Sequence, residues 1–249
     1  MNRNNLEGFI TVESIESYVN KDDIYRYLNA RSSESTQSEY WTKMVDEILK
    51  ECLQYAKPTY TSETFEIEND AGKGALKIAM HPNLSFKSYD LTGLLDKSDQ
   101  IHVVGVTLGL FLDRKIHYYM RSDATKGVIL DACASVVIEA CCDYIQDRLT
   151  ERDLNQNVNL YHTNRYSPGY GDLGLDTIKP LSGLIQMTKK TGIHVSEHFL
   201  MQPQKSVIFI MGVSKIPLKE ATLICEHKCL QCQLKSCQYR EGLTNEFKK

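Results

Sequence analysis

The spacing of apolar and polar residues along the chain predicts both helices and strands. Apolar residues recur every three to four positions over 38–56 and over a longer segment from 123 to 152. This period places them on one face of a helix, which would pack against the rest of the protein. Three shorter helices are predicted over 22–28, 88–95 and 176–191.

Extended segments separate these helices. Residues 60–80 include alternating apolar and polar side chains on either side of a turn, and the apolar run 102–107 is typical of a buried strand. We therefore expect an α+β fold, with helices packed on a twisted and mostly antiparallel sheet. The other predicted strands are 160–162 and a hairpin made of 193–201 and 206–213.

Composition and charge exclude several classes of protein. The 249 residues are 42% hydrophobic, which is ordinary for a globular domain with its own core. The 29 basic and 32 acidic residues leave a net charge of −3, whereas a protein that binds nucleic acid through phosphates carries a basic excess. No secretory signal or membrane-spanning segment is recognised. We expect a cytoplasmic protein without a nucleic-acid or membrane partner.

The eight cysteines fall into two groups. One group lies in apolar helical patterns, which predicts small buried side chains rather than reactive thiols. The other group occupies thirteen residues near the end of the chain, with the spacing C-x3-C-x2-C-x4-C. The first group is Cys52, Cys133, Cys141 and Cys142, and the second is Cys225, Cys229, Cys232 and Cys237.

The clustered cysteines predict a metal site in a reducing compartment. Four thiolates so close in sequence suit an iron–sulfur cluster, whose ligands can come from one short loop. Structural zinc more often uses two pairs of ligands that a longer spacer separates. The iron–sulfur cluster is therefore favoured over zinc, and thiols without a metal remain an alternative. We expect two parts of the chain, a domain over 1–223 and a Cys-rich segment over 224–249.

The octapeptide 165–172 is the strongest candidate for a binding site. Arg165 offers a forked donor that pairs with a carboxylate through two hydrogen bonds. Pro168 and Gly169 favour a turn in which the main chain comes close to a ligand, and the ring of Tyr170 follows at once. These residues could hold a zwitterion that carries a flat ring. The alternative is a surface turn with an exposed arginine.

Three blocks of sequence resemble the activation (reactivation) domain of cobalamin-dependent methionine synthase. The R-x-x-x-G-Y motif at 165–170 is similar to that family's motif for S-adenosylmethionine (AdoMet). Residues 139–148 resemble the family's helix, including its AdoMet-binding Glu, and residues 191–203 resemble the hairpin that follows. The blocks keep the family's order, and the resemblance is strongest over 122–213. One departure is Gly171-Asp172, which stands where the family has a Pro- and Cys-containing segment.

The resemblance implies an AdoMet site in an open groove between the predicted long helix and the octapeptide. Arg165 would pair with the AdoMet carboxylate, and Glu139 would accept from its ammonium group. Ser167 and Gly169 would offer main-chain groups, while Tyr170 would pack or hydrogen-bond beside the ligand. The methyl group would face outward, so that it can reach a corrin ring.

The resemblance also implies partners. No methyltransferase barrel or cobalamin-binding domain is recognised, so we expect a free-standing module that acts on a separate methionine synthase or related corrinoid protein. That partner would hold cob(II)alamin, and reactivation would need one electron and the methyl group of AdoMet. Reduced flavodoxin or a ferredoxin-type protein is the expected electron donor. An iron–sulfur cluster at the cysteines would offer a route for that electron.

Two other functions remain open on the sequence. The spacing of Cys225, Cys229 and Cys232 is that of radical-AdoMet enzymes. However, little chain follows them for a barrel, Gln231 replaces the usual aromatic residue, and Cys237 could fill the free iron position. The other alternative is a zinc-bearing interaction domain without catalytic function.

Overall fold

The computed structural model describes residues 5–28, 39–156 and 160–218. Seven strands in this part of the chain form one antiparallel sheet: β1 (Asn5–Phe9), β2 (Thr59–Asp70), β3 (Ala75–Ile78), β4 (His81–Lys87), β5 (Gln100–Thr107), β6 (Tyr161–His162) and β9 (Ser206–Ser214). Their order is β4-β3-β2-β5-β9-β6, and β1 pairs with the first half of β2. A separate two-stranded sheet joins β7 (His194–Val195) to β8 (Met201–Gln202).

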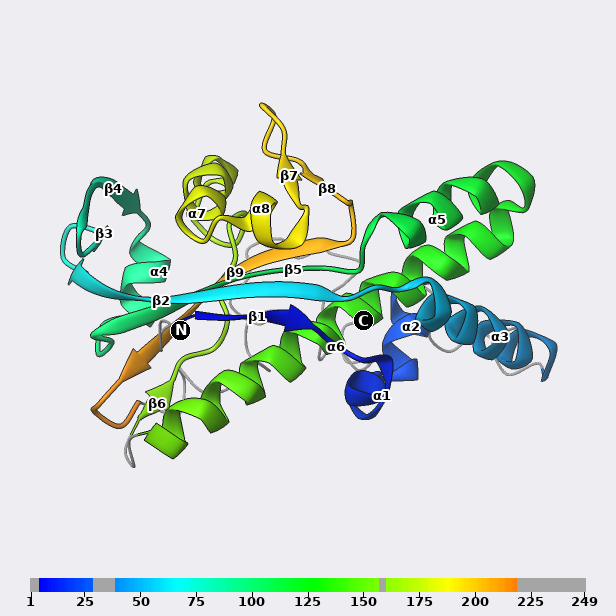
Figure 1. Cartoon of the computed structure of the whole chain (residues 1–249), viewed down its shortest axis with the longest axis horizontal. Coiled ribbons are helices and arrows are strands. Elements are labelled where there is room, and N and C mark those ends of the chain that lie inside the picture. The colour runs from blue at the N-terminus through cyan, green and yellow to red at the C-terminus, as the bar shows by residue number, and fades with distance from the viewer. Residues whose placement is uncertain (1–4, 29–38, 157–159, 219–249) are drawn as a thin grey trace, which may run out of the picture.

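Helices cover both faces of the large sheet (Figure 1). On one face lie α1 (Val12–Ile15), α2 (Lys21–Tyr27), α3 (Glu39–Tyr55), α5 (Leu110–Ser122) and α6 (Ala124–Gln156). On the other face lie α4 (Tyr89–Leu94), α7 (Ile178–Leu184) and α8 (Met187–Thr191). The predicted α+β fold with a mostly antiparallel sheet is therefore confirmed.

The alternation of side chains along β5 separates two hydrophobic cores. Val104 and Val106 are fully buried against the α6 side of the sheet. Ile101 and Val103 are fully buried on the opposite side, with α4, α7 and α8. Successive side chains of a strand point to opposite faces, and burial on both faces explains why this segment is continuously apolar.

The long helix begins and ends close to the predicted bounds. Asp123 caps the start of α6, because its Oδ1 accepts a hydrogen bond from the backbone N–H of Lys126 at 3.2 Å. The middle of the helix is buried against α2, α3 and α5 as well as the sheet. The thiols of Cys52, Cys133, Cys141 and Cys142 are free and buried, as the apolar pattern around them predicted.

Two predictions about individual elements were wrong, and one helix was not predicted. Residues 193–213 do not form one hairpin, since β7 pairs with β8 and β9 pairs with β5 and β6. The segment 176–191 is not one helix, because Gln186 adopts a left-handed conformation, with φ of +52°, between α7 and α8. The helix α5 was not predicted. Its pattern is interrupted by exposed aromatic side chains, Phe111 and Tyr118.

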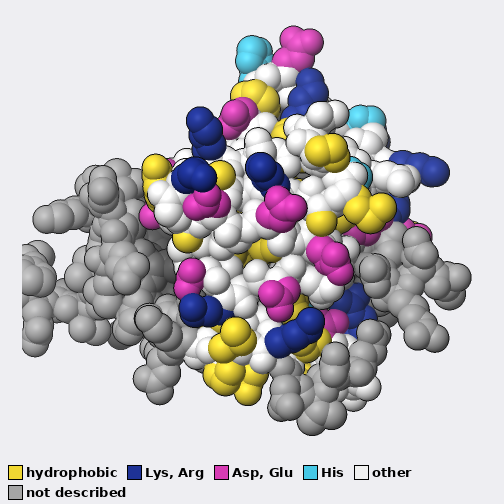
Figure 2. Space-filling model, turned by 90° about the vertical axis from the view of Figure 1, so that its left-hand side faces the viewer, with side chains coloured by type: hydrophobic (Ala, Val, Ile, Leu, Met, Phe, Trp, Pro, Cys, Tyr) yellow, Lys and Arg dark blue, Asp and Glu magenta, His cyan; other side chains and the backbone are white. Residues whose placement is uncertain are grey.

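One face of the molecule (Figure 2) shows the mixed charges that the near-neutral net charge leads one to expect. On the face shown in Figure 2, Lys and Arg side chains are interspersed with Asp and Glu and form no basic stripe. Within the described ranges, no helix combines the length and the apolar character that crossing a membrane requires.

Candidate functional site

A cavity of about 300 Å³ lies between α6, the turn after β6 and the strand β9. Residues from all three segments line it, although they are far apart in sequence. The five residues proposed from the sequence for AdoMet are all among them: Glu139, Arg165, Ser167, Gly169 and Tyr170. The predicted groove between the long helix and the octapeptide is thus present in the structure.

Arg165 forms the charged side of this cavity. Its guanidinium lies 3.3 Å from a carboxylate oxygen of Glu139 and 2.8 Å from one of Asp143. The two acids are one turn apart on α6, so both reach the same arginine. The guanidinium also lies over the ring of Phe209, 5.6 Å from its centroid, on the neighbouring strand β9. These contacts fix the arginine, whose side chain is 13% exposed, at the cavity wall.

Asp143 was missed by the sequence argument, although it lies within the block that resembles the family's helix. The available signal was its position four residues after Glu139. The side chains of Glu139 and Asp143 are 46% and 49% exposed, so two acidic groups beside the largely buried Arg165 are accessible to solvent.

The turn that follows β6 is held by its own backbone hydrogen bonds. The N–H of Gly169 donates to the carbonyl of Leu173 at 2.8 Å, and the N–H of Tyr170 donates to the carbonyl of Ser167 at 3.1 Å. Gly169 has a φ of +93°, a conformation that favours glycine. Tyr170 remains 55% exposed beside the cavity. The turn therefore presents a rigid main chain and an accessible aromatic ring.

The remaining wall of the cavity is mostly apolar, with Ser206 as a polar member. Ile178, Met201 and Ile208 contribute to it, together with the buried thiol of Cys142. Burial raises the pKa of Cys142 well above its ordinary value, so the group is a neutral thiol. A ligand with a charged end and a flat, less polar end matches a cavity with this distribution of side chains.

Comparison with known protein families shows to which family this chain belongs. Residues 73–215 match the family described as vitamin B12 dependent methionine synthase, activation domain. The chain belongs to this family. A crystal structure of the MetH reactivation domain bound to AdoHcy has the same fold, with a TM-score of 0.65 and 18% identity. The match covers 86% of this chain and 80% of that one. The comparison with curated proteins gives no match.

The activation-domain match includes the octapeptide, and the structure explains its unusual end. The side chain of Asp172 caps α4, because its carboxylate accepts hydrogen bonds from the Ser88 hydroxyl and from the backbone N–H of Tyr89, the latter at 2.7 Å. Gly171 has a φ of +50°, and a Cβ there would overlap the side chains of Asp90 and Tyr166. Gly171 and Asp172 thus lie where the turn is attached to α4, and neither is part of the cavity wall.

The predicted metal ligands Cys225, Cys229, Cys232 and Cys237 lie outside the described residues. The iron–sulfur or zinc site therefore stays a prediction, as does the division into 1–223 and 224–249.

Proposed function

We propose that this activation domain binds AdoMet in the cavity between α6 and the turn at 165–170. One observation supports the proposal most strongly. Glu139 on the helix and four residues on the turn were selected from sequence alone, and they line a single cavity. The four turn residues are Arg165, Ser167, Gly169 and Tyr170. The fold shared with an AdoHcy-bound reactivation domain agrees with this assignment.

The charges of the site suit the amino-acid end of AdoMet. Arg165 already pairs with Glu139 and Asp143, and a guanidinium has five N–H donors. A bound zwitterion would give its carboxylate to Arg165 and its ammonium to Glu139, replacing one ion pair by two. AdoMet carries one positive charge more than AdoHcy, and the two carboxylates around one arginine favour that extra charge.

The domain would act on a corrinoid partner. Cob(II)alamin on that partner gains one electron from reduced flavodoxin or a ferredoxin-type donor, giving cob(I)alamin. The cobalt then takes the methyl group of AdoMet, and the sulfur keeps the electron pair of the broken bond, which leaves methylcobalamin and AdoHcy. The contribution of this chain is to hold AdoMet with its methyl group at the open side of the cavity.

Calorimetry with AdoMet tests the binding site. We expect Arg165→Ala to weaken binding by at least about tenfold, because a hydrogen-bonded charge pair contributes roughly 1.5–3 kcal/mol. Arg148→Ala is the matched control, since Arg148 also pairs with a carboxylate of α6, but on an exposed surface outside the cavity lining. No binding by the unchanged protein, or equal binding by Arg165→Ala, would reject the assignment.

A reaction with a partner tests the function. The protein is mixed with a corrinoid methyltransferase that holds cob(II)alamin, and AdoMet and a reductant are added. We expect the visible spectrum to change to that of methylcobalamin, and the change to be slower with Arg165→Ala. Release of 5′-deoxyadenosine from AdoMet would instead favour the radical-AdoMet alternative.

A further inference from the structure

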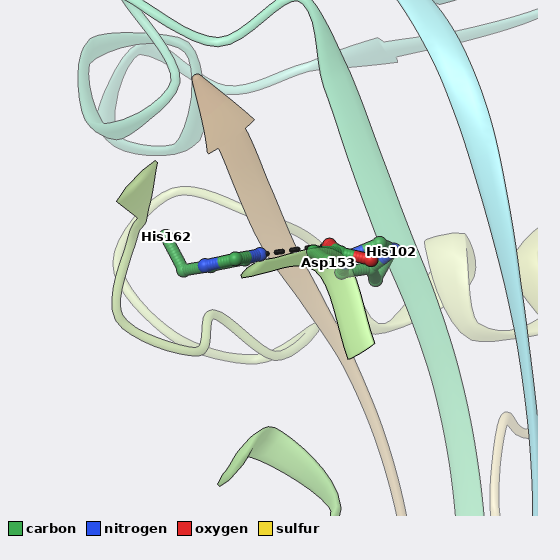
Figure 3. A group of neighbouring side chains, drawn as sticks. All are labelled: His102, Asp153 and His162. Atoms are coloured by element: carbon green, nitrogen blue, oxygen red, sulfur yellow. Dashed lines mark hydrogen bonds and ion pairs between the residues drawn. The ribbon is translucent and has the colours of Figure 1, made fainter. Parts of the chain in front are cut away.

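A second group of polar side chains is buried beneath the sheet, away from the cavity lining. His102 on β5, Asp153 near the end of α6 and His162 on β6 converge there, with Asp153 between the two histidines (Figure 3). The Oδ2 atom of Asp153 lies 2.7 Å from Nε2 of His102 and 2.9 Å from Nε2 of His162. The exposed fractions of the three side chains are 1%, 8% and 6%, in that chain order.

Neighbouring residues fix the orientation of this group. The hydroxyl of Thr64 lies 2.9 Å from Nδ1 of His102, so the opposite ring nitrogen faces Asp153. Arg152 donates to the other carboxylate oxygen, Oδ1, through Nε at 2.9 Å and Nη2 at 2.7 Å. As a result, Oδ2 is directed at the two imidazoles. Metal-binding sites use the same kind of support, in which outer residues orient the ligands.

We propose that His102, Asp153 and His162 bind one divalent transition-metal ion, for which Zn²⁺ is the best chemical match. Two imidazoles and one carboxylate are ligands that Zn²⁺ accepts, with a fourth position left for water. The three donor atoms come from three separate elements and lie within 4.8 Å of one another. Tetrahedral Zn²⁺ with bonds near 2.0–2.1 Å separates its ligands by about 3.3 Å. The two oxygen–nitrogen distances, 2.7 and 2.9 Å, would lengthen by about half an ångström, and the two histidine nitrogens would approach each other by at most about 1.5 Å.

The positions of the histidine protons allow a metal ion to replace them at Nε2. An ionised Asp153 only accepts hydrogen bonds, which assigns the protons to Nε2 of both histidines when no metal is bound. When a metal replaces these protons, each neutral histidine carries its proton on Nδ1 instead, and His102 donates that proton to Thr64. A hydroxyl both donates and accepts, so Thr64 fits either state. The ion would connect the end of α6 to β5 and β6 on both sides of β9. The residues Thr163 and Asn164 alone separate His162 from Arg165.

Cobalt is the probe for this site, because Co²⁺ occupies Zn²⁺ sites and absorbs visible light. The full chain is prepared with Cys225, Cys229, Cys232 and Cys237 replaced by Ser, which removes the competing thiolates. We expect one Co²⁺ per chain, visible as a d–d band without thiolate charge transfer, and its displacement by one Zn²⁺. His162→Gln in the same background should weaken Co²⁺ binding by more than about 100-fold, since even an outer residue contributes 10–100-fold.

Two further variants keep the test decisive. His194→Gln removes an exposed histidine of β7 and should leave Co²⁺ binding unchanged. Thr64→Val keeps the ligands and should weaken binding by about 10–100-fold, so it replaces His162→Gln if that variant does not show a native circular dichroism spectrum. Absence of the Co²⁺ band in the folded serine background, or an equal band in folded His162→Gln or Thr64→Val, overturns the proposal.

Discussion

Gly171 occupies a place in the turn where no other residue fits without strain. Its φ is positive, and the side chains of Asp90 and Tyr166 fill the space where a Cβ would lie. We expect Gly171→Ala to lower the free energy of unfolding by about 1–3 kcal/mol. Gly183→Ala is the control, because that glycine is in the helix α7 and has open space around it. Urea denaturation should show no loss there, or a gain of about 0.5–1 kcal/mol.

Asp172 should make the stability of the folded protein depend on pH, because its ionised carboxylate attaches the turn to α4. Desolvation opposes ionisation of its carboxyl, but the hydrogen bonds from Ser88, Tyr89 and Asp90 outweigh it and lower its pKa below the ordinary value. A lowered pKa in the folded state adds stability above the unfolded pKa, near 3.9, and this stability is lost as the pH falls through the folded pKa.

This sign gives a test by urea denaturation. Asp172→Asn should be less stable than the unchanged protein at pH 7, and the difference should shrink as the pH is lowered below about 4. Asp96→Asn, at an exposed carboxyl next to Lys97, should show a smaller effect. A difference for Asp172→Asn that stays constant across this pH range would contradict the assignment.

At the scale of elements, α6 links the two ends of the molecule through its buried face. Leu149 is fully buried on this helix, whereas Leu154, five residues later, is 47% exposed. Leu149→Ala should lower the free energy of unfolding by about 2–5 kcal/mol, since it leaves a cavity in the core. Leu154→Ala should cost less than about 1 kcal/mol. Similar losses from the two variants would mean that the helix is packed differently.

The sequence predicted those helices and strands whose own residues carry a clear periodic or apolar pattern. The periodicity of 38–56 and 123–152 and the apolar run at 102–107 correspond to α3, α6 and β5. The pairing of β9 could not be read in the same way. Residues next to a Pro-containing loop favour a local hairpin, but Thr107 lies opposite Ser206, 99 residues away. Pairing over this distance depends on the shared core and not on neighbouring residues.

The residues of the candidate site also divide into those that a local pattern reveals and those that depend on the packing of distant elements. Arg165, Gly169 and Tyr170 were found because they form a short motif in one turn, and Glu139 was found through the family resemblance. Asp143 and the group around Asp153 were missed, because their roles depend on which elements fold against each other. A charged residue near a helix end is ordinarily exposed, and only the sheet beneath α6 gives Asp153 two buried histidines as partners.

At the scale of the whole molecule, the C-terminal cysteines distinguish a binding module from one that also carries electrons. We expect anaerobic reconstitution with iron and sulfide to give the visible absorbance and electron paramagnetic resonance of an iron–sulfur cluster. Replacing Cys229 and Cys232 by Ser should abolish both signals. Replacing the buried Cys52 by Ser should leave them unchanged. Zinc content without these signals would favour the zinc alternative.

The position of β9 has a consequence during synthesis. Among the strands in the described part of the chain, β9 comes last in the sequence, yet it lies in the interior of the sheet, between β5 and β6. Until residues 206–214 have left the ribosome, one side of β5 has no strand to pair with and exposes its backbone groups. Both hydrophobic cores also need side chains of β9, Phe209 and Met211 in one and Ile208 and Ile210 in the other. Neither core can therefore be completed before this strand is available. A ribosome-bound chain that stops before residue 206 should aggregate or recruit chaperones, whereas one that extends well past 214 should fold.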